Sequence, residues 1–542
     1  MHNVYNFLSK YIDKTMTLSR LSLEDRELAE QLLVELCDED TLAGTLSEAG
    51  VYLGYQQEIL SFRGIEKKQR LAQLVVLTLG DGLLRSKSIL HALLRDKELP
   101  IPRSFKPGSS SAYQLTQELD LPEVFAGTQI LSQRNPLERL EPILTIDPLL
   151  DYQQEVLEKA FPLLTNGERC LISIPTGGGK TRVATELLHR WHHKLSSSTA
   201  SLWLAHTEEL CEQAFQCISE IWRASGSCRP AVIYRAWGRH TKKLVHGEIY
   251  HGTHGTERSS TIDSIIVSTP QTALNLFGNQ HKGSFGKQFK NISIAVIDEA
   301  HRAAAPTYLE VIRQLNKFSA DTIPILGLSA TPIRETYASN PYKGTEELFD
   351  LFSNLIEPLD TLGQDISPLD ALRNRGVLAK LLIHNDPIRD DSPHTLSDYI
   401  QHQRLSHQDD SPALVFTQDV ARSKMIAALL TERGLSSESI DSSSIPAERI
   451  YVIEQLRQGT VKILCNCELL TTGFDAPNVN QIFLARSTNS PVLYKQIIGR
   501  GLRGPIVGGN EFCHLYFCGV SFPFKDDPNT VEFARAIWSS PN

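Results

Sequence analysis

The chain has 542 residues, of which 41% are hydrophobic and 22% charged, and 63 acidic side chains against 54 Lys and Arg give it a formal net charge of −9. Because a single hydrophobic core rarely grows to this size, the length predicts three or four domains and argues against a single-domain protein. The acidic balance excludes a protein held on nucleic acid by bulk positive charge, so any such binding must occur in local grooves.

The N-terminal part has the apolar spacing of helices. Apolar residues recur at helical intervals from Leu21 to about Leu99, and the stretch 71–84 is typical of a buried helix. Eight acids between Glu24 and Asp40 indicate a solvated helix face. The breaker-rich run 100–111 predicts a loop. We therefore expect a small all-helical accessory domain over 1–125, followed by a linker over 126–144.

Short apolar runs then alternate with helical stretches. The first group of expected strands is 170–174, 202–205, 265–268, 292–297 and 323–328, and the second is 413–416, 461–465, 482–485 and 515–517. Strands that alternate with helices predict parallel sheets built from βαβ units. We expect two tandem α/β domains over 145–338 and 379–525, joined by a connector over 339–378 and followed by a tail over 526–542.

A glycine-rich segment follows the first of these strands. Pro175-Thr176-Gly177-Gly178-Gly179-Lys180-Thr181 stands between the expected strand 170–174 and a helical stretch. Backbone N–H groups of such a loop cradle phosphate oxygens, and the helix N-terminus adds partial positive charge. The pattern predicts an ATP site in which Lys180 reaches the β- and γ-phosphates and Thr181 binds Mg²⁺. Ile174 stands where the strict pattern has its first glycine.

Two adjacent carboxylates end another expected strand. The apolar run 292–297 leads directly into Asp298-Glu299-Ala300-His301. Ligands of open α/β sheets bind at the carboxyl ends of the strands. Asp298 is suited to hold Mg²⁺, and Glu299 is suited to act as general base on the attacking water.

These two motifs occur in order with Leu328-Ser329-Ala330-Thr331-Pro332 and with the segment Gln496–Arg503. Together the four make residues 145–520 resemble the superfamily 2 helicases and translocases of the DEAH type. Leu470-Thr471-Thr472-Gly473-Phe474-Asp475-Ala476-Pro477 is similar to the corresponding segment of the RadD-like, XPB-like and type III restriction motor group.

The resemblance implies two RecA-like domains with ATP in the cleft between them. It also implies that Gln153, beside Tyr152, reads adenine, and that Gly473 and Asp475 bind ATP. Ser329 and Thr331 would couple hydrolysis to domain movement. Arg500 and Arg503 would be arginine fingers, and Gln496 would position the γ-phosphate or the water.

The same resemblance implies contacts to nucleic acid. These contacts would be made to the sugar–phosphate backbone by His206, Thr207, Thr269, Pro270, Thr417 and Thr472. Hydroxyl and loop N–H groups bind phosphate without reading bases, so no sequence specificity is expected. DNA is favoured over RNA because the most similar groups act on duplex DNA. A basic stretch forms either a single-strand contact or a solvated face: Arg235, Arg239, Lys242 and Lys243, with Tyr234 and Trp237 interleaved.

Alternatives stay open at this point. The chain could be an ATP-controlled switch, or a motor subunit that recruits a partner effector such as a nuclease through its helical domain, or an RNA helicase. Nine cysteines without a C-x-x-C pair favour a reducing compartment, and the sequence lacks a leader and a long apolar run, which predicts a cytoplasmic protein. His240, His246, His251 and His254 predict a polar loop and no zinc. Cys465 and Cys467 are expected to be buried thiols.

Overall fold

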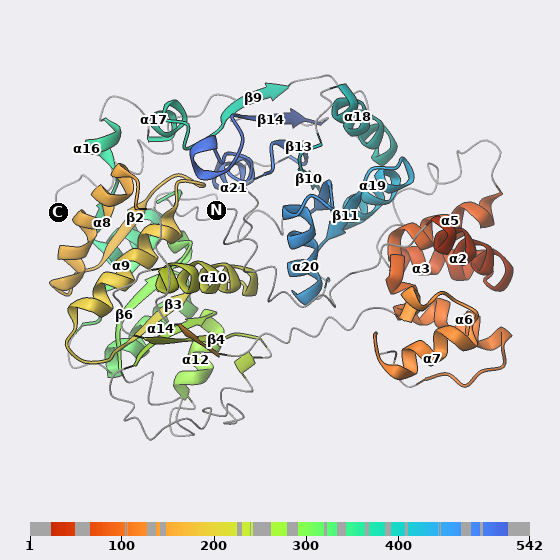
Figure 1. The fold of residues 1–542 in the computed structure, drawn as a ribbon, viewed down its shortest axis with the longest axis horizontal. Coiled ribbons are helices and arrows are strands. Elements are labelled where there is room, and N and C mark those ends of the chain that lie inside the picture. Colours follow the sequence, from red (N-terminus) through yellow and green to blue (C-terminus); the bar gives the residue numbers. More distant parts are fainter. Residues whose placement is uncertain are drawn as a thin grey trace.

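The elements of the chain group into a helical part and two α/β domains (Figure 1). The structure is a computed structural model. It describes residues 23–48, 66–102, 105, 107–126, 137–140, 148–224, 230–238, 240–241, 262–278, 291–318, 322–332, 343–363, 368–384, 392–406, 410–442, 444, 446–467, 478–487 and 491–518. The predicted tail 526–542 lies outside these residues.

The N-terminal part consists of helices around one apolar core, as predicted. Its elements are α2 (Leu23–Leu36), α3 (Glu39–Glu48), α5 (Lys67–Leu79), η1 (Gly80–Arg85), α6 (Lys87–Asp96), α7 (Ser110–Glu118) and η2 (Glu123–Ala126). Leu33, Leu71, Leu93 and Phe125 are buried in the shared core. The helix predicted over 71–84 ends at Leu79, because Gly80 takes a positive φ of 53° and the chain continues as a 3-10 turn.

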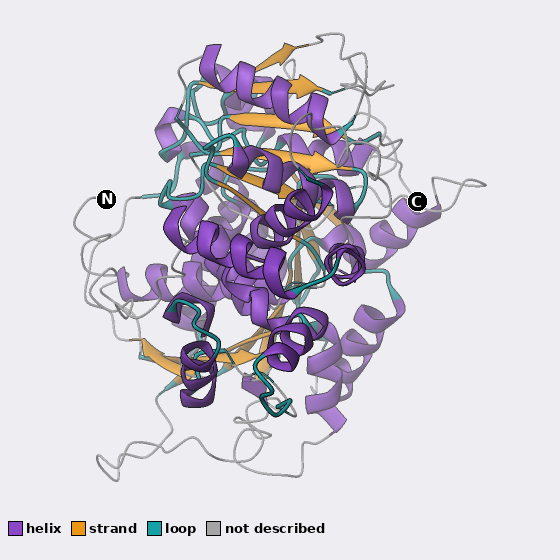
Figure 2. Cartoon of the chain, turned by 90° about the vertical axis from the view of Figure 1, so that its right-hand side faces the viewer, coloured by secondary structure: helices purple, strands orange, loops and turns teal. Residues whose placement is uncertain are grey.

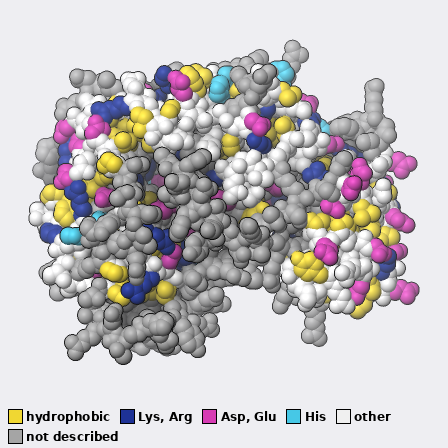
Figure 3. Space-filling model, viewed as in Figure 1, with side chains coloured by type: hydrophobic (Ala, Val, Ile, Leu, Met, Phe, Trp, Pro, Cys, Tyr) yellow, Lys and Arg dark blue, Asp and Glu magenta, His cyan; other side chains and the backbone are white. Residues whose placement is uncertain are grey.

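The acidic residues of α2 and α3 lie on the outside of this part. Glu24, Glu27, Glu35 and Asp38 are exposed, and acidic side chains gather over these helices in the space-filling view (Figure 3). The prediction of a solvated helix face is confirmed for these residues.

The first α/β domain is built on an eight-stranded sheet in the order β1-β4-β5-β3-β6-β7-β2-β8. Its strands are β1 (Leu137–Leu140), β2 (Cys170–Ser173), β3 (Ala200–Leu204), β4 (Ala231–Ala236), β5 (Asp263–Ser268), β6 (Ile292–Ile297), β7 (Ile325–Ser329) and β8 (Asn354–Ile356). All neighbours pair in parallel except β1, which runs antiparallel to β4. Every residue of β2, β3, β5 and β7 is buried, as expected for central strands covered on both faces.

Helices cover both faces of this sheet (Figure 2). One apolar core contains residues of α8 (Asp151–Thr165), α9 (Lys180–Lys194) and α10 (Glu208–Ala224). The other contains residues of α12 (Pro270–Gly278), α14 (Pro306–Phe318) and α15 (Lys343–Phe352). The five strands predicted for this domain are all present.

The first sheet extends past the predicted boundaries at 145 and 338. The segment predicted as the linker 126–144 contains β1, and the segment predicted as the connector 339–378 contains β8, which pairs with β2. Both are short edge strands, and β1 has two charged residues in its four positions. Such strands carry little apolar signal in the sequence, because only part of their surface is buried.

The second α/β domain has a six-stranded, fully parallel sheet in the order β11-β12-β10-β13-β14-β9. Its strands are β9 (Lys380–His384), β10 (Ala413–Thr417), β11 (Ser437–Ile440), β12 (Ile463–Asn466), β13 (Gln481–Ala485) and β14 (Phe512–Phe517). Its helices are α18 (Pro393–Ser406), α19 (Val420–Glu432), α20 (Pro446–Arg457) and α21 (Pro491–Ile498), with α16 (Leu359–Leu362) and α17 (Pro368–Asn374) before β9. The predicted fold class, two tandem parallel α/β domains after a helical region, is confirmed.

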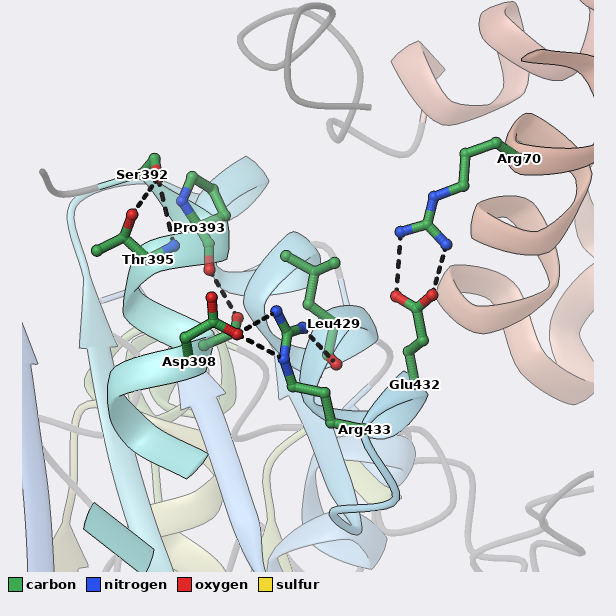
Figure 4. Close-up of polar contacts among 9 residues, drawn as sticks. Arg70, Ser392, Pro393, Thr395, Asp398, Leu429, Glu432 and Arg433 are labelled. Carbon is green, nitrogen blue, oxygen red and sulfur yellow. Dashed lines mark hydrogen bonds and ion pairs between the residues drawn. The ribbon is translucent and has the colours of Figure 1, made fainter. Parts of the chain in front are cut away.

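The helical part docks on α19 of the second α/β domain, not on the first domain that follows it in sequence. Met425 and Leu429 of α19 belong to the same apolar core as Leu71 and Val75. Arg70, which is 1% exposed, donates to both carboxylate oxygens of Glu432 at 2.6 and 3.0 Å (Figure 4). A two-pronged ion pair of this kind fixes the orientation of the two elements as well as their contact.

Removing one partner of this ion pair should destabilise the docking. We expect Arg70→Ala to cost about 3 kcal/mol, because the Glu432 carboxylate loses its buried partner, and to lower the urea midpoint of the transition that includes the helical part. The control is Asp398→Ala, which removes the carboxylate partner of Arg433 (Figure 4). The Asp398 side chain is 67% exposed, so its loss should cost under ~1 kcal/mol. Equal midpoints for the two variants would contradict the assignment.

Candidate active site

The loop between β2 and α9 has no space for side chains at its glycines. Gly177 and Gly179 have φ values of +85° and +88°, a region that favours glycine. A Cβ on Gly178 would lie 2.5 Å from Cγ2 of Ile174. Ile174, the residue that departs from the strict phosphate-loop pattern, is fully buried and packs beneath the loop. Residues 176–179 of the predicted phosphate loop thus form a tight turn, and Lys180 and Thr181 begin α9.

Lys180, the first residue of α9, lies inside the molecule. Its Nζ donates to the Ile174 carbonyl at 3.2 Å. Burial lowers the pKa of Lys180, while the charges of Glu299 and Asp298 act in the opposite direction. The lysine is therefore placed beside the two predicted carboxylates.

The N-terminal turn of α8 is bonded to the same loop. The Tyr152 hydroxyl donates to the Gly178 carbonyl at 2.7 Å, and Gln153 Nε2 donates to that carbonyl at 3.0 Å. Gln153 Oε1 accepts from the Leu150 N–H at 3.0 Å. In this conformation the Gln153 amide links the start of α8 to the phosphate loop, and its role as a reader of adenine stays a prediction.

The two carboxylates follow β6 and have different environments. Burial raises the pKa of Asp298 to about 7. Burial also acts to raise the pKa of Glu299, but the neighbouring His301 and Lys180 outweigh burial and lower it. Nδ1 of His301 lies 3.4 Å from Oε2 of Glu299. His301 and Lys180 therefore favour the ionised form of Glu299, whereas burial favours the protonated form of Asp298.

Glu299 also has unusual backbone geometry. Its φ and ψ are 49° and 53°, the left-handed region that a residue with a side chain rarely adopts. Such conformations cost free energy and persist where the surrounding structure holds them, often at active sites. The geometry therefore supports a functional role for the Glu299 position.

Ser329 ends β7, the strand beside β6 and β2, and Thr331 follows two positions later. Both are buried. The Ser329 hydroxyl donates to the Thr331 carbonyl at 2.7 Å and accepts from the Thr331 N–H at 3.2 Å. The segment is thus a closed turn at the edge of the sheet that carries the phosphate loop.

The second domain presents Arg500 and Arg503 to the phosphate loop, after α21, in which Gln496 is buried. The Arg500 charge lowers the pKa of Lys180, Asp298 and Glu299 alike. Cγ of Arg503 lies 3.8 Å from the position that a Cβ on Gly177 would occupy. The structure therefore brings both predicted arginines to the loop. Gly473 and Asp475 lie outside the described residues.

Two apolar residues at this contact carried no signal in the sequence. Leu378 lies close to Gly177 and Leu372 close to Gly178, and both are buried. A leucine in a connecting segment has no chemistry that a motif search could find, so only the fold shows that these two touch the phosphate loop.

A cavity of about 490 Å³ lies at the carboxyl ends of β3 and β5, where both domains contribute to its wall. Four of the predicted nucleic-acid contacts line it: His206, Thr207, Thr269 and Pro270. Arg449 of α20 also lines it and pairs with Glu209 of the first domain at 3.0 Å. Burial lowers the pKa of His206 to about 4, so the imidazole that lines the cavity is neutral at pH 7.

Thr417 is not among the residues that line this cavity, and its contact with nucleic acid stays a prediction. Its side chain is fully buried, and its hydroxyl donates to the carbonyls of Asp419 at 2.8 Å and Asn466 at 3.2 Å. The hydroxyl therefore links β10 to the end of β12. Thr472 lies outside the described residues.

The single-strand contact suggested for the 234–243 stretch is wrong for its first three members. Tyr234, Arg235 and Trp237 are buried. The Arg235 guanidinium lies 3.5 Å from the centre of the Phe215 ring and donates to Glu212 at 3.2 Å. Arg235 thus forms an internal ion pair between β4 and α10. Arg239, Lys242 and Lys243 lie outside the described residues.

Three remaining predictions concern cysteines, histidines and membranes. Cys465 is buried as expected, whereas Cys467 is partly exposed and lies 3.4 Å from the Gln418 carbonyl. His246, His251 and His254 lie outside the described residues. None of the helices that the structure describes has both the length and the apolar character needed to cross a bilayer.

Comparison with known proteins places this geometry in a family. Residues 147–334 match the family described as type III restriction enzyme, res subunit, and residues 392–504 match the helicase conserved C-terminal domain. These two matches together cover more than half of the chain.

Individual relatives agree with these matches. One relative is a Saccharomyces cerevisiae protein with the provisional name ATP-dependent helicase IRC3. It is 27% identical to this chain over 393 residues, which are 69% of this chain and 52% of the relative. The ATP-dependent RNA helicase DHH1 of Yarrowia lipolytica is 24% identical over 67% of this chain and 62% of the relative. The chain spans about half the length of several curated relatives.

A solved structure shares the fold. Mss116p bound to single-stranded RNA and AMP-PNP has a TM-score of 0.50 and 15% identity to this chain, over 72% of each. That similarity concerns the paired RecA-like domains alone. The two family matches and the helicase relatives lead to one conclusion: the chain belongs to the superfamily 2 helicases and is related to the motor subunit of type III restriction enzymes.

Proposed function

We propose that this protein is a nucleic-acid-dependent ATPase that translocates on DNA or remodels it by ATP-driven closure of its two RecA-like domains. One observation carries the proposal: Arg503 of the second domain lies against Gly177 of the phosphate loop in the first domain, and the Arg500 charge acts on Lys180 and Glu299. The binding site for a triphosphate would be complete only when the two domains are together.

The residues of the loop bind and orient the nucleotide. N–H groups of residues 176–181 and the N-terminus of α9 bind the phosphates, and Lys180 neutralises the β- and γ-phosphates. Thr181 and Asp298 would hold Mg²⁺, since a hydroxyl and a buried carboxylate are the oxygen ligands this ion prefers. When bound, the ion neutralises charge on the phosphates. Gln153, Gly473 and Asp475 complete the proposed nucleotide site.

Hydrolysis needs a base and a countercharge. Glu299, held as a carboxylate by His301, would accept a proton from the attacking water. Arg500 and Arg503 would stabilise the charge that develops on the γ-phosphoryl group, and Gln496 would orient the water. The turn formed by Ser329 and Thr331 would transmit the change at the γ-phosphate to the domain contact.

Nucleic acid would bind in the cavity between the domains. His206, Thr207, Thr269 and Pro270 offer ring, hydroxyl and backbone groups suited to sugar and phosphate. Thr472 is proposed to join them. We favour DNA as the substrate because the first domain matches the family described as type III restriction enzyme, res subunit, while the RNA helicases among the relatives make RNA the first competitor.

ATP turnover measured with single- and double-stranded DNA and RNA of equal length tests the proposal. We expect stimulation by DNA, greater than by RNA, and a fall in stimulation as salt rises, because phosphate contacts release counterions. Stimulation by RNA alone would make the protein an RNA helicase.

A lack of stimulation by any nucleic acid would favour an ATP-controlled interaction switch. The exposed acidic face of α2 and α3 supports that alternative, because it repels phosphate and suits a basic protein surface.

A further inference from the structure

The segment 376–379, which lies between α17 and β9, forms a short antiparallel ladder with the chain that follows Arg500. The Ala379 N–H donates to the Leu502 carbonyl at 2.9 Å, and the Gly504 N–H donates to the Val377 carbonyl at 2.9 Å. Leu378 and Arg503 form an antiparallel bridge between these bonds. The position of Arg503 is therefore set by the backbone of the 376–379 segment.

This backbone contact leaves no room for a side chain at Gly504. A Cβ on Gly504 would lie 2.2 Å from the Gly376 carbonyl oxygen, far inside van der Waals distance. The obstructing atom belongs to the backbone, so a larger residue would have to push the two segments apart.

The Leu378 side chain points in the other direction, toward the phosphate loop. Leu378 is 1% exposed, and its Cδ2 lies 3.1 Å from the position that a Cβ on Gly177 would occupy. Leu502 and Arg503 contribute the next atoms around that position, at 3.8 Å each. A single leucine thus lies opposite Arg503 in the backbone ladder and packs through its side chain on Gly177.

We propose that Leu378 is a positioning residue that sets the distance between the arginine segment and the phosphate loop. The inference rests on the proposed ATPase function and adds a residue outside the groups proposed to bind the nucleotide. Leu378 would act by steric contact: its side chain stops the approach of the two domains where the guanidinium groups face the γ-phosphate. A displacement of about 1 Å at a reacting centre can cost about 10² in rate.

Turnover of Leu378→Ala in the full chain tests the proposal, with saturating DNA and with kcat expressed per nucleotide site titrated with a fluorescent ATP analogue. We expect kcat to fall by about 10- to 100-fold. The KM for ATP should stay near the wild-type value, because the loop that binds ATP is unchanged. Leu378→Met, which conserves volume, should restore most of the rate.

Two further variants separate positioning from stability. Leu430→Ala removes an equally buried leucine from another part of the second domain and should leave kcat per site unchanged. Gly504→Ala, which disturbs the other side of the same contact, should reproduce the kcat loss of Leu378→Ala. If Leu378→Ala does not fold, Leu378→Val should show a smaller loss in the same direction.

The outcomes are distinguishable. Wild-type kcat in Leu378→Ala, or in Leu378→Val where the Ala variant does not fold, would overturn the inference and leave the ATPase assignment standing. An equal kcat loss in Leu430→Ala would also overturn it. A wild-type protein that no nucleic acid stimulates would instead refute the proposed function.

Discussion

Glu299→Gln is expected to stop ATP hydrolysis while ATP binding is retained. Glutamine has the shape of glutamate but cannot accept a proton, so turnover should fall by about 10²- to 10⁴-fold, the contribution typical of a general base. The dissociation constant of a fluorescent ATP analogue should remain close to that of the wild type, because Lys180 and the loop N–H groups are unchanged.

The control for this prediction is Glu310→Gln on α14. Glu310 pairs with Arg313 on the exposed face of that helix. Its substitution removes a carboxylate of the same type that has no proposed role in the ATP site, so turnover should stay unchanged. Normal hydrolysis in Glu299→Gln would transfer the role of base to another group.

The central strands could be predicted from the sequence because burial on both faces gives them apolar runs. The phosphate loop could be predicted because its glycines and Lys180 follow such a strand. β6 was predicted with its observed bounds, 292–297. Motif chemistry identified Lys180, Asp298 and Glu299, since each follows a strand whose carboxyl end lies at the same edge of the first sheet.

What the sequence could not predict depends on contacts between distant segments. β4 was missed because Arg235 interrupts its apolar pattern, and only the fold shows that Glu212 and Phe215 make that arginine a core residue. The docking of the helical part on α19 depends on Arg70 and Glu432, which are 362 positions apart. Ordinary charges and leucines carry no signal of such pairings.

Arg500→Ala is expected to give the second large loss of turnover. Its charge lowers the pKa of Lys180, Asp298 and Glu299, so a positive charge acts on the groups proposed to bind the phosphates and the water. Arginine fingers contribute about 10³ to 10⁵ in rate, so kcat should fall within that range. ATP affinity should change little, because the first domain supplies the binding groups.

Two comparisons sharpen this prediction. Arg500→Lys keeps the charge but loses the planar fork of donors, so it should recover only part of the rate. Arg313→Ala removes an arginine whose side chain is 63% exposed and should leave turnover unaltered. If Arg500→Ala keeps wild-type kcat while Arg503→Ala loses it, Arg503 alone is the finger. That result would also support the positioning role proposed for Leu378, since Leu378 faces Arg503 in the backbone ladder and packs on Gly177.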